Sequence, residues 1–282
     1  MAAPVEQAVL INGEPSSSLS VQDRGLQYGH GLFETIAIRN GQPQHWEKHV
    51  DRLLKGCRQL KIKTPELSLL HSEVIQLAVD KERAVIKILY TAGTSGRGYR
   101  ISESHEPNRI ISLTPWPDYP DDNYHNGITI RLCAMRLGRN PHLAGIKHLN
   151  RLEQVLARSE WNDCGISEGL MLDTQGFLIE GTMSNVFFVK NNTLCTPGLE
   201  QCGIAGVMRD IILSLAESLS IKVYIDEFTP SDLFQADEVF MTNSLIGIWP
   251  VSKIVVEENI YFDSPGKITR RLQRQLKHNN YS

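Results

Sequence analysis

Lys147 is the residue of this sequence best placed for covalent chemistry. It lies in an apolar stretch, between Ile146 and Leu149. A lysine with apolar neighbours either extends its ammonium group to water or occupies a pocket in which its pKa falls. Most such lysines are ordinary surface residues, but a neutral amine can form a Schiff base with a carbonyl compound. Lys147 is therefore a candidate Schiff-base lysine.

Glu180 is a second candidate, because it directly precedes a run of small and polar residues at 181–185. A carboxylate at the end of a strand is normally a solvated turn residue. Beside a bound pyridine ring, the same carboxylate would hold a proton on the ring nitrogen. That proton makes the ring an electron sink, which stabilises a carbanion on an attached substrate. The local sequence leaves both interpretations open.

Two further stretches have groups that suit a phosphate. Gly203 and Gly206 precede an expected helix, so backbone N–H groups could point at an anion at its positive end. Residues 242–244, Thr-Asn-Ser, end an apolar strand and could add hydroxyl donors. Such glycine loops are more often plain turns. The pattern at 203–209 is neither a Walker loop nor GxGxxG, which argues against a nucleotide.

Arg52 lies on the flank of an amphipathic helix expected over residues 46–60. The buried stripe of this helix would consist of apolar residues at helical spacing: Trp46, Val50, Leu53, Leu54, Cys57 and Leu60. An arginine on the flank usually forms a surface ion pair. Its planar guanidinium could instead bind a phosphate through paired hydrogen bonds.

The elements that must position these residues divide into two expected domains. Hairpins are predicted at Asn12-Gly13 and Asn40-Gly41, and again around Asn191-Asn192. A helix is expected at 66–80 and strands at 84–91 and 109–114. The proline-rich and acidic stretch at 118–126 is typical of a linker, so we expect a smaller domain at 1–117 and a larger one at 127–282 that carries Lys147. Because strands and helices do not alternate regularly, the predicted fold class is α+β.

Composition excludes several classes of protein. The net charge of −3 gives no reason to expect a nucleic-acid partner. The five cysteines form no CxxC pair, which argues against a disulfide framework or a metal site. This pattern favours a location in the cytoplasm. No apolar run approaches the ~20 residues of a membrane helix. We therefore expect an ordinary globular protein without a nucleic-acid partner, a metal or a membrane helix.

Five stretches, taken together, resemble the fold-type IV pyridoxal-phosphate (PLP) enzymes. This family includes branched-chain aminotransferases, D-amino acid aminotransferases and aminodeoxychorismate lyases. The order and spacing of the stretches match the family over nearly the whole chain, which is far more specific than any single match. The matching stretches are residues 23–35, 49–53, 180–185, 206–209 and 242–244.

The segment around Lys147 narrows the resemblance. Residues 137–158 are closely similar to the PLP-lysine segment of bacterial aminodeoxychorismate lyases, and the loop at 94–99 resembles theirs. Aminotransferases of the family tend to carry a tyrosine shortly after the lysine, where this chain has Asn150 and Leu152. The resemblance implies release of pyruvate from 4-amino-4-deoxychorismate to give 4-aminobenzoate. The alternatives are an aminotransferase and a catalytically silent binding protein that keeps the fold.

The resemblance also implies a role for each candidate. Lys147 would carry PLP as a Schiff base, and Glu180 would pair with its pyridine nitrogen. The remaining residues would bind either the cofactor phosphate (Arg52, Val207, Met208 and Thr242) or the substrate (Tyr28, Arg97 and Asn150). Enzymes of this family usually work as homodimers, so a homodimer is expected here.

Overall fold

The computed structural model describes residues 8–96, 98–102 and 105–278 of the chain. Its contacts divide the chain into two compact units. Unit 1 comprises Met1–Pro117 and Ile146–Asn150, and unit 2 comprises Asp118–Gly145 and Arg151–Ser282. Each unit is described by itself.

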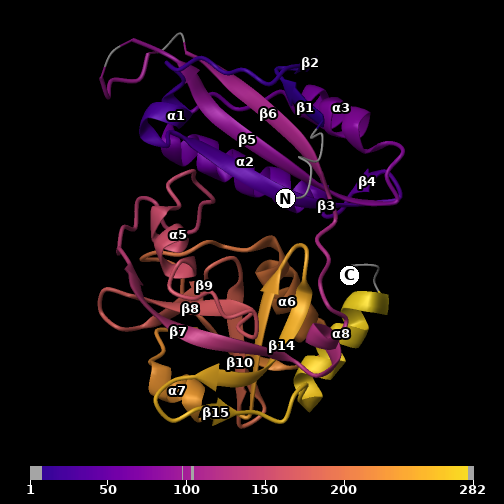
Figure 1. Ribbon diagram of the computed structural model, residues 1–282, viewed down its shortest axis with the longest axis vertical. Helices are drawn as coiled ribbons and strands as arrows, with labels where there is room; N and C mark the ends of the chain where they lie inside the picture. The colour runs from indigo at the N-terminus through magenta and orange to yellow at the C-terminus, as the bar shows by residue number, and fades with distance from the viewer. Residues whose placement is uncertain (1–7, 97, 103–104, 279–282) are drawn as a thin grey trace. The chain divides into compact units, whose positions relative to one another are not determined.

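In the described part of unit 1, six strands form an antiparallel sheet in the order β2-β1-β6-β5-β3-β4 (Figure 1). The strands are β1 (Ala8–Ile11), β2 (Glu14–Pro15), β3 (Gly31–Arg39), β4 (Gln42–Pro43), β5 (Arg83–Thr94) and β6 (Glu106–Pro115). The two expected hairpins are confirmed. Asn12-Gly13 and Asn40-Gly41 all have positive φ, which a tight two-residue hairpin turn requires.

Helices α1 (Arg24–Tyr28), α2 (Trp46–Leu60) and α3 (Leu67–Ala78) complete unit 1, and α2 and α3 pack against the sheet. Of the predicted buried stripe of α2, Val50, Leu53 and Cys57 are buried, whereas Trp46, Leu54 and Leu60 are half-buried. The buried face of α2 also contains Gly56, where a Cβ would lie 2.6 Å from Leu32 Cδ2, so the helix and β3 lie in close contact there. Helix α1 was not expected, because five residues are too few to show a helical period.

The segment Ile146–Asn150 belongs to unit 1 because it pairs with β3. Phe33 N donates to Lys147 O at 2.9 Å, and Leu149 N donates to Gly31 O at 2.9 Å. The short strand β4 pairs only with the far end of β3, so this edge of β3 is open at Gly31–Phe33. Backbone groups at an open edge take up another chain segment. The expected grouping of residues 127–282 as one body carrying Lys147 therefore differs from the contacts observed.

Unit 2 contains a mixed sheet, which in its described part has nine strands in the order β12-β11-β10-β13-β14-β7-β8-β9, with β15 beside β14. Pairing of Glu180 in β9 with Asn185 in β10 closes part of this sheet into a ring. The strands are β7 (Ile128–Leu137), β8 (Glu168–Asp173), β9 (Leu178–Gly181), β10 (Asn185–Lys190), β11 (Thr193–Pro197), β12 (Lys222–Asp226), β13 (Glu238–Asn243), β14 (Gly247–Val255) and β15 (Ile260–Tyr261).

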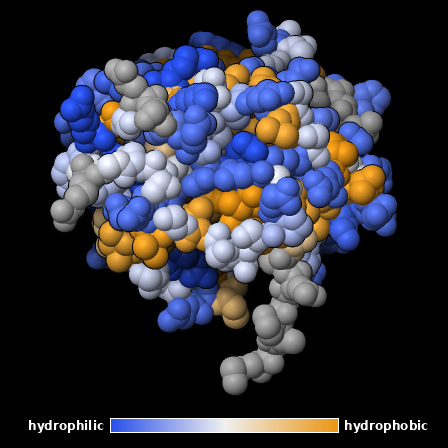
Figure 2. Space-filling view, turned by 90° about the horizontal axis from the view of Figure 1, so that it is seen from above, coloured by the Kyte–Doolittle hydropathy of each residue, from blue (hydrophilic) through white to orange (hydrophobic). Residues whose placement is uncertain are grey.

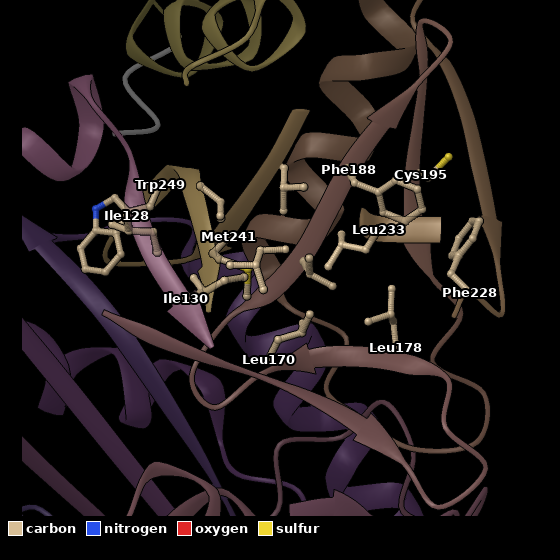
Figure 3. Packing of buried hydrophobic residues seen from close by; sticks show 14 of the residues in the cluster. Ile128, Ile130, Leu170, Leu178, Phe188, Cys195, Phe228, Leu233, Met241 and Trp249 are labelled. Carbon is tan, nitrogen blue, oxygen red and sulfur yellow. The ribbon is translucent and has the colours of Figure 1, made fainter. Parts of the chain in front are cut away.

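The core of unit 2 lies on both faces of this sheet, as the alternation of side chains along a strand requires. Phe187 stacks on Phe240, with ring centroids 5.1 Å apart, in a cluster that includes residues of α6 and α8. Its neighbour Phe188 points to the other face and joins the cluster shown in Figure 3. The helices of unit 2 are α4 (Asp122–His125), α5 (Leu152–Arg158), α6 (Val207–Ser218), α7 (Pro230–Phe234) and α8 (Lys267–His278).

The stretch expected as a linker, residues 118–126, contains α4 and takes part in the packing of unit 2. Tyr119 and Tyr124 meet the ring of Trp249 edge-on, with Tyr119 at a centroid distance of 4.9 Å. Within the described ranges, none of the helices is long and apolar enough to cross a membrane.

Replacing Phe240 with Ala tests the packing of unit 2. Phe240 is fully buried, so we expect the free energy of unfolding to fall by about 3–5 kcal/mol. Tyr261→Ala is the control: its side chain is 68% exposed, and we expect a change of no more than about 0.5 kcal/mol. Urea unfolding of both variants measures the difference. Equal effects would contradict the described core.

Candidate active site

Lys147 lies in a loop of unit 1 with its backbone tied to β3, and its side chain is half-buried. The Nζ atom lies over the face of the Phe33 ring, 4.3 Å from the ring centroid. An amine in this position is held near the sheet rather than extended into water, and the face of the ring attracts its charged form. The structure therefore places the amine beside β3, where the next residue, Glu34, points into a buried cluster.

That cluster joins β3 to α2. Glu34, only 2% exposed, accepts hydrogen bonds from Arg52 Nε at 2.9 Å and Arg52 Nη2 at 2.5 Å. His49 Nδ1 lies 2.6 Å from Glu34 Oε2. Two parallel bonds to one carboxylate fix the plane of the Arg52 guanidinium. Arg52 is thus a guanidinium held rigidly on a helix, not the surface ion pair that a flank position usually forms.

The charges of the cluster are strongly perturbed. Burial alone would raise the pKa of Glu34, but the charge of Arg52 and hydrogen bonds from His49 and Arg52 outweigh it and lower the pKa to about 2. Burial lowers the pKa of His49; Glu34 opposes this, while the charges of Arg52 and Lys147 add to it. His49 Nε2 is buried and, among the described residues, has no hydrogen-bond partner.

No role was predicted for Glu34 or His49. A usable signal was present, because His49 and Arg52 are three residues apart and such residues share a helix face. Two basic side chains on the face that packs against a strand predict a buried acid opposite them. The helix and the hairpin at Asn40-Gly41 were both predicted, but the register that places Glu34 opposite His49 was not.

Glu180 is the corresponding feature of unit 2. It is 3% exposed, and its Oε2 accepts a hydrogen bond from Ile204 N at 2.8 Å. It is therefore not a solvated turn residue. Arg151 is close enough for the two charges to interact: burial lowers the pKa of Arg151, and Glu180 opposes that shift. The carboxylate is held at a fixed place by strand β9 and by the loop before α6.

The N-terminus of α6 has the features of an anion site. Its N-cap is Gly206, and no side chain caps it. The first-turn N–H groups of a helix have no partner within the helix, and they point outward. A Cβ on Gly206 would lie 2.0 Å from Asn185 Oδ1, so only glycine fits here. The side chains of Val207 and Met208 are buried, so only their backbone N–H groups could bind a phosphate.

Thr242 is less clearly suited to its expected role. Its side chain is fully buried, and Oγ1 donates to Gly247 O at 2.5 Å. A bond from this hydroxyl to a phosphate would require its hydrogen to turn away from Gly247.

Two of the expected substrate residues lie in unit 1, and the third, Arg97, lies outside the described residues. Tyr28 ends α1 and is 36% exposed, and its ring meets Tyr99 edge-on at 5.4 Å. Asn150 Nδ2 donates to Gly29 O at 3.2 Å. Tyr28 and Asn150 are therefore held together through Gly29.

The structure thus places the candidates in two groups. Unit 1 contains Arg52, Lys147, Tyr28 and Asn150, and unit 2 contains Glu180, Val207, Met208 and Thr242. In the described part of the chain no cluster of side chains suits a metal ion.

The comparison with known protein families covers most of the chain. The model of the family "amino-transferase class IV" matches residues 31–254, more than half of the sequence. The chain belongs to the amino-transferase class IV family. The family resemblance and the α+β fold class expected from the sequence are both confirmed.

Individual relatives match over nearly their full length. The chain is 40% identical to an aminodeoxychorismate lyase of Vibrio harveyi, over 94% of this chain and 98% of that protein. It is 32% identical to a putative branched-chain-amino-acid aminotransferase of Methanocaldococcus jannaschii, over 95% of each. Among solved structures, the 4-amino-4-deoxychorismate lyase of Pseudomonas aeruginosa superposes with a TM-score of 0.92 at 43% identity, over 97% of this chain and 100% of that one.

Replacing Glu34 with Gln should change how stability depends on pH. The change leaves the buried Arg52 without its carboxylate, so near neutral pH we expect a loss of about 3–5 kcal/mol. Folding lowers the pKa of Glu34 from 4.5 to about 2, so its contribution is complete above pH 4.5 and is lost as the pH falls towards about 2. The difference in the free energy of unfolding between wild type and E34Q should become smaller as the pH falls through that range.

Urea unfolding of both proteins at a series of pH values measures this difference. The control is Glu73→Gln, which breaks a second buried pair in unit 1, with Arg109. A difference between wild type and E34Q that stays constant with pH would show that Glu34 is not ionised in the folded protein.

Proposed function

We propose that the protein is a PLP-dependent aminodeoxychorismate lyase, which converts 4-amino-4-deoxychorismate to 4-aminobenzoate and pyruvate. The observation that carries this proposal is the likeness to two such lyases over nearly the whole length of both chains. PLP is the cofactor of the class IV family, in agreement with the cofactor expected from the sequence. The product 4-aminobenzoate places the reaction in folate biosynthesis.

The side chains and helix ends of the structure suit PLP, which has an aldehyde, a phosphate and a pyridine nitrogen. Lys147 supplies an amine for the aldehyde. Arg52, with its guanidinium plane fixed by Glu34, and the uncapped N-terminus of α6 supply donors for the phosphate. Glu180 supplies a buried carboxylate for the ring nitrogen. We assign these roles to the four groups, with Val207 and Met208 acting through their backbone N–H groups and Thr242 assisting through its hydroxyl.

When bound, PLP would supply an electron sink for the substrate carbon next to the linked nitrogen, which would make a proton on that carbon removable. Lys147 Nζ would hold the cofactor and, as a neutral amine, would accept this proton. The enolpyruvyl carbon–oxygen bond then breaks, and protonation of the departing group gives pyruvate. Loss of the group makes the ring of the product aromatic. Glu180 would hold a proton on the pyridine nitrogen.

Tyr28, Asn150 and Arg97 are the proposed substrate residues. The substrate bears two carboxylates, which need fixed donors or cations. Asn150 is positioned by Gly29, and Tyr28 is exposed at the end of α1. Arg97 belongs to the glycine-rich loop that resembles the lyase loop.

We also propose that the protein is a cytoplasmic homodimer. Helix α5 exposes an apolar face, with Leu152 at 68%, Val155 at 60% and Leu156 at 46% exposure. Hydrophobic residues reach the surface among hydrophilic ones in Figure 2. An apolar patch of this kind is typical of a protein interface, and a second copy of the chain is the proposed occupant. The five cysteines, all in described ranges, are free, which suits a reducing compartment.

An aminotransferase is the second candidate function, favoured by the likeness to the Methanocaldococcus protein. It would use the same lysine and cofactor but return the proton to the cofactor, without losing a leaving group. Assays for pyruvate and 4-aminobenzoate after addition of aminodeoxychorismate separate the two activities. Accumulation of pyridoxamine phosphate with amino acids, without release of pyruvate from aminodeoxychorismate, would favour the aminotransferase.

Replacing Lys147 with Ala should abolish release of pyruvate, since the variant lacks both the group that binds PLP covalently and the proposed base. Borohydride reduction of the wild type followed by peptide mapping should place the phosphopyridoxyl group on Lys147. Lys253→Ala, a change outside the candidate site, is the control and should keep both properties. Near-normal turnover by K147A, or a label at another lysine, would refute the role of Lys147.

Replacing Arg52 with Gln should weaken the binding of PLP. A charge-assisted hydrogen bond is worth roughly 1.5–3 kcal/mol, so we expect the dissociation constant to rise roughly 10- to 150-fold. The matched control is Arg109→Gln, which also removes an arginine paired with a buried glutamate of unit 1. Titration of the cofactor-free proteins with PLP, followed by absorbance, measures both. If the two variants bind PLP equally well, Arg52 does not bind the phosphate.

A further inference from the structure

Glu168, the first residue of β8, is a buried carboxylate that accepts an unusual number of hydrogen bonds. It is 1% exposed. Its Oε1 accepts from Gly169 N at 2.8 Å, Thr182 N at 3.1 Å and Thr182 Oγ1 at 2.5 Å. Its Oε2 accepts from Met183 N at 3.2 Å and Ser184 Oγ at 2.6 Å.

Within the described residues, no ion pair compensates this charge. Among the ion pairs of the described residues, none involves Glu168. Burial of a carboxylate is costly unless charge-assisted hydrogen bonds replace its water. The carboxylate therefore depends on the five donors, and the donors are held in place by the carboxylate.

All but one of these donors belong to the turn between β9 and β10. Thr182, Met183 and Ser184 follow Glu180 by two to four residues. The turn is fixed by further bonds, from Gly181 N to Ser184 O at 2.6 Å and from Asn243 Nδ2 to Met183 O at 3.1 Å. The backbone that leaves Glu180 thus wraps closely around the carboxylate of Glu168.

We propose that Glu168 is a positioning residue for Glu180 and, through it, for the pyridine ring of PLP. Glu180 pairs with Met171 on β8 and with Asn185 on β10. Glu168 lies on the same strand as Met171 and holds the turn that joins Glu180 to Asn185. Glu168 therefore fixes the turn that follows Glu180, in addition to the strands β8 and β10 that pair with Glu180. This inference rests on the proposed role of Glu180 towards PLP.

A merely structural role would make Glu168 equivalent to another buried carboxylate of unit 2. Glu238 accepts hydrogen bonds from Ile268 N at 3.0 Å, Thr269 N at 2.8 Å and Thr269 Oγ1 at 2.7 Å, at the start of α8. These donors are not part of the candidate site. Glu238→Gln is therefore a matched control for Glu168→Gln, because each change turns an amide NH₂ towards groups that are themselves donors.

The experiment compares wild type, E168Q, E238Q and E180Q. Each protein is freed of cofactor and titrated with PLP, and its unfolding is measured without PLP. We expect both E168Q and E238Q to lose stability. Only E168Q should also raise the dissociation constant of PLP, by about 10-fold, the effect typical of a residue that orients a ligand-binding group. The pH profile of the absorbance of bound PLP should shift in E168Q in the same direction as in E180Q.

A second pair of variants covers the case in which E168Q does not fold. Thr182→Val removes one hydroxyl donor to Glu168, and Thr269→Val removes one donor to Glu238. Weaker binding of PLP by T182V than by T269V would support the proposal.

Two outcomes would overturn it. In the first, E168Q and E238Q bind PLP equally well, or the two threonine variants do, while E180Q binds PLP weakly. This result would refute the role of Glu168 but not that of Glu180. Unchanged PLP binding and absorbance in E180Q would remove the role of Glu180 and the inference with it. The lyase function would still stand in either case, because release of pyruvate tests it separately.

Discussion

The pairing of Ile146–Asn150 with the open edge of β3 is the interaction on which the candidate site depends. It holds the amine of Lys147 over Phe33, one residue from the carboxylate that fixes Arg52. The bonds are ordinary backbone hydrogen bonds, and the close approach of the two segments requires glycine at position 31, where a Cβ would lie 2.6 Å from Leu149 Cδ1. The placement of Lys147 also relies on β4 being too short to cover this part of β3. A longer β4 would close the edge and leave the lysine segment without a partner.

The two units stabilise their buried carboxylates in different ways. Glu34 is compensated by the guanidinium of Arg52 and a hydrogen bond from His49, so its environment is set by charges. Glu168 is compensated mainly by dipoles of the turn between β9 and β10, so its environment is set by backbone geometry. Loss or movement of a charged group would weaken the first arrangement. A change in the backbone of the turn would weaken the second. Each suits what it holds: a guanidinium in one case and a strand end in the other.

Features determined by neighbouring residues could be predicted from the sequence. The Asn-Gly hairpins and the stripe of α2 are local, because turn chemistry and a helical period act over a few residues. The α+β class followed from the irregular order of elements. The membership of Lys147 in unit 1 and the Glu34–His49 contact could not be predicted, because both depend on which strand edge stays open and on register. Helix α5 was not predicted because its seven residues, Leu152–Arg158, are too few to show a helical period.

The lysine and its charged neighbours cannot decide between a lyase and an aminotransferase. Both kinds of enzyme need an amine, a cation that binds the cofactor phosphate and a carboxylate that binds the pyridine nitrogen. The difference must lie where the substrate is held. Asn150 is positioned by Gly29, whose φ is +63° and whose missing Cβ would lie 2.2 Å from Asn150 Oδ1. Any larger residue at position 29 would displace the Asn150 side chain. Gly29, which follows Tyr28, is thus in contact with Asn150. Asn150 lies in the segment shortly after the lysine, in which aminotransferases of the family tend to carry a tyrosine. The contact between Gly29 and Asn150 therefore belongs to the part of the proposed site in which the two reactions can differ.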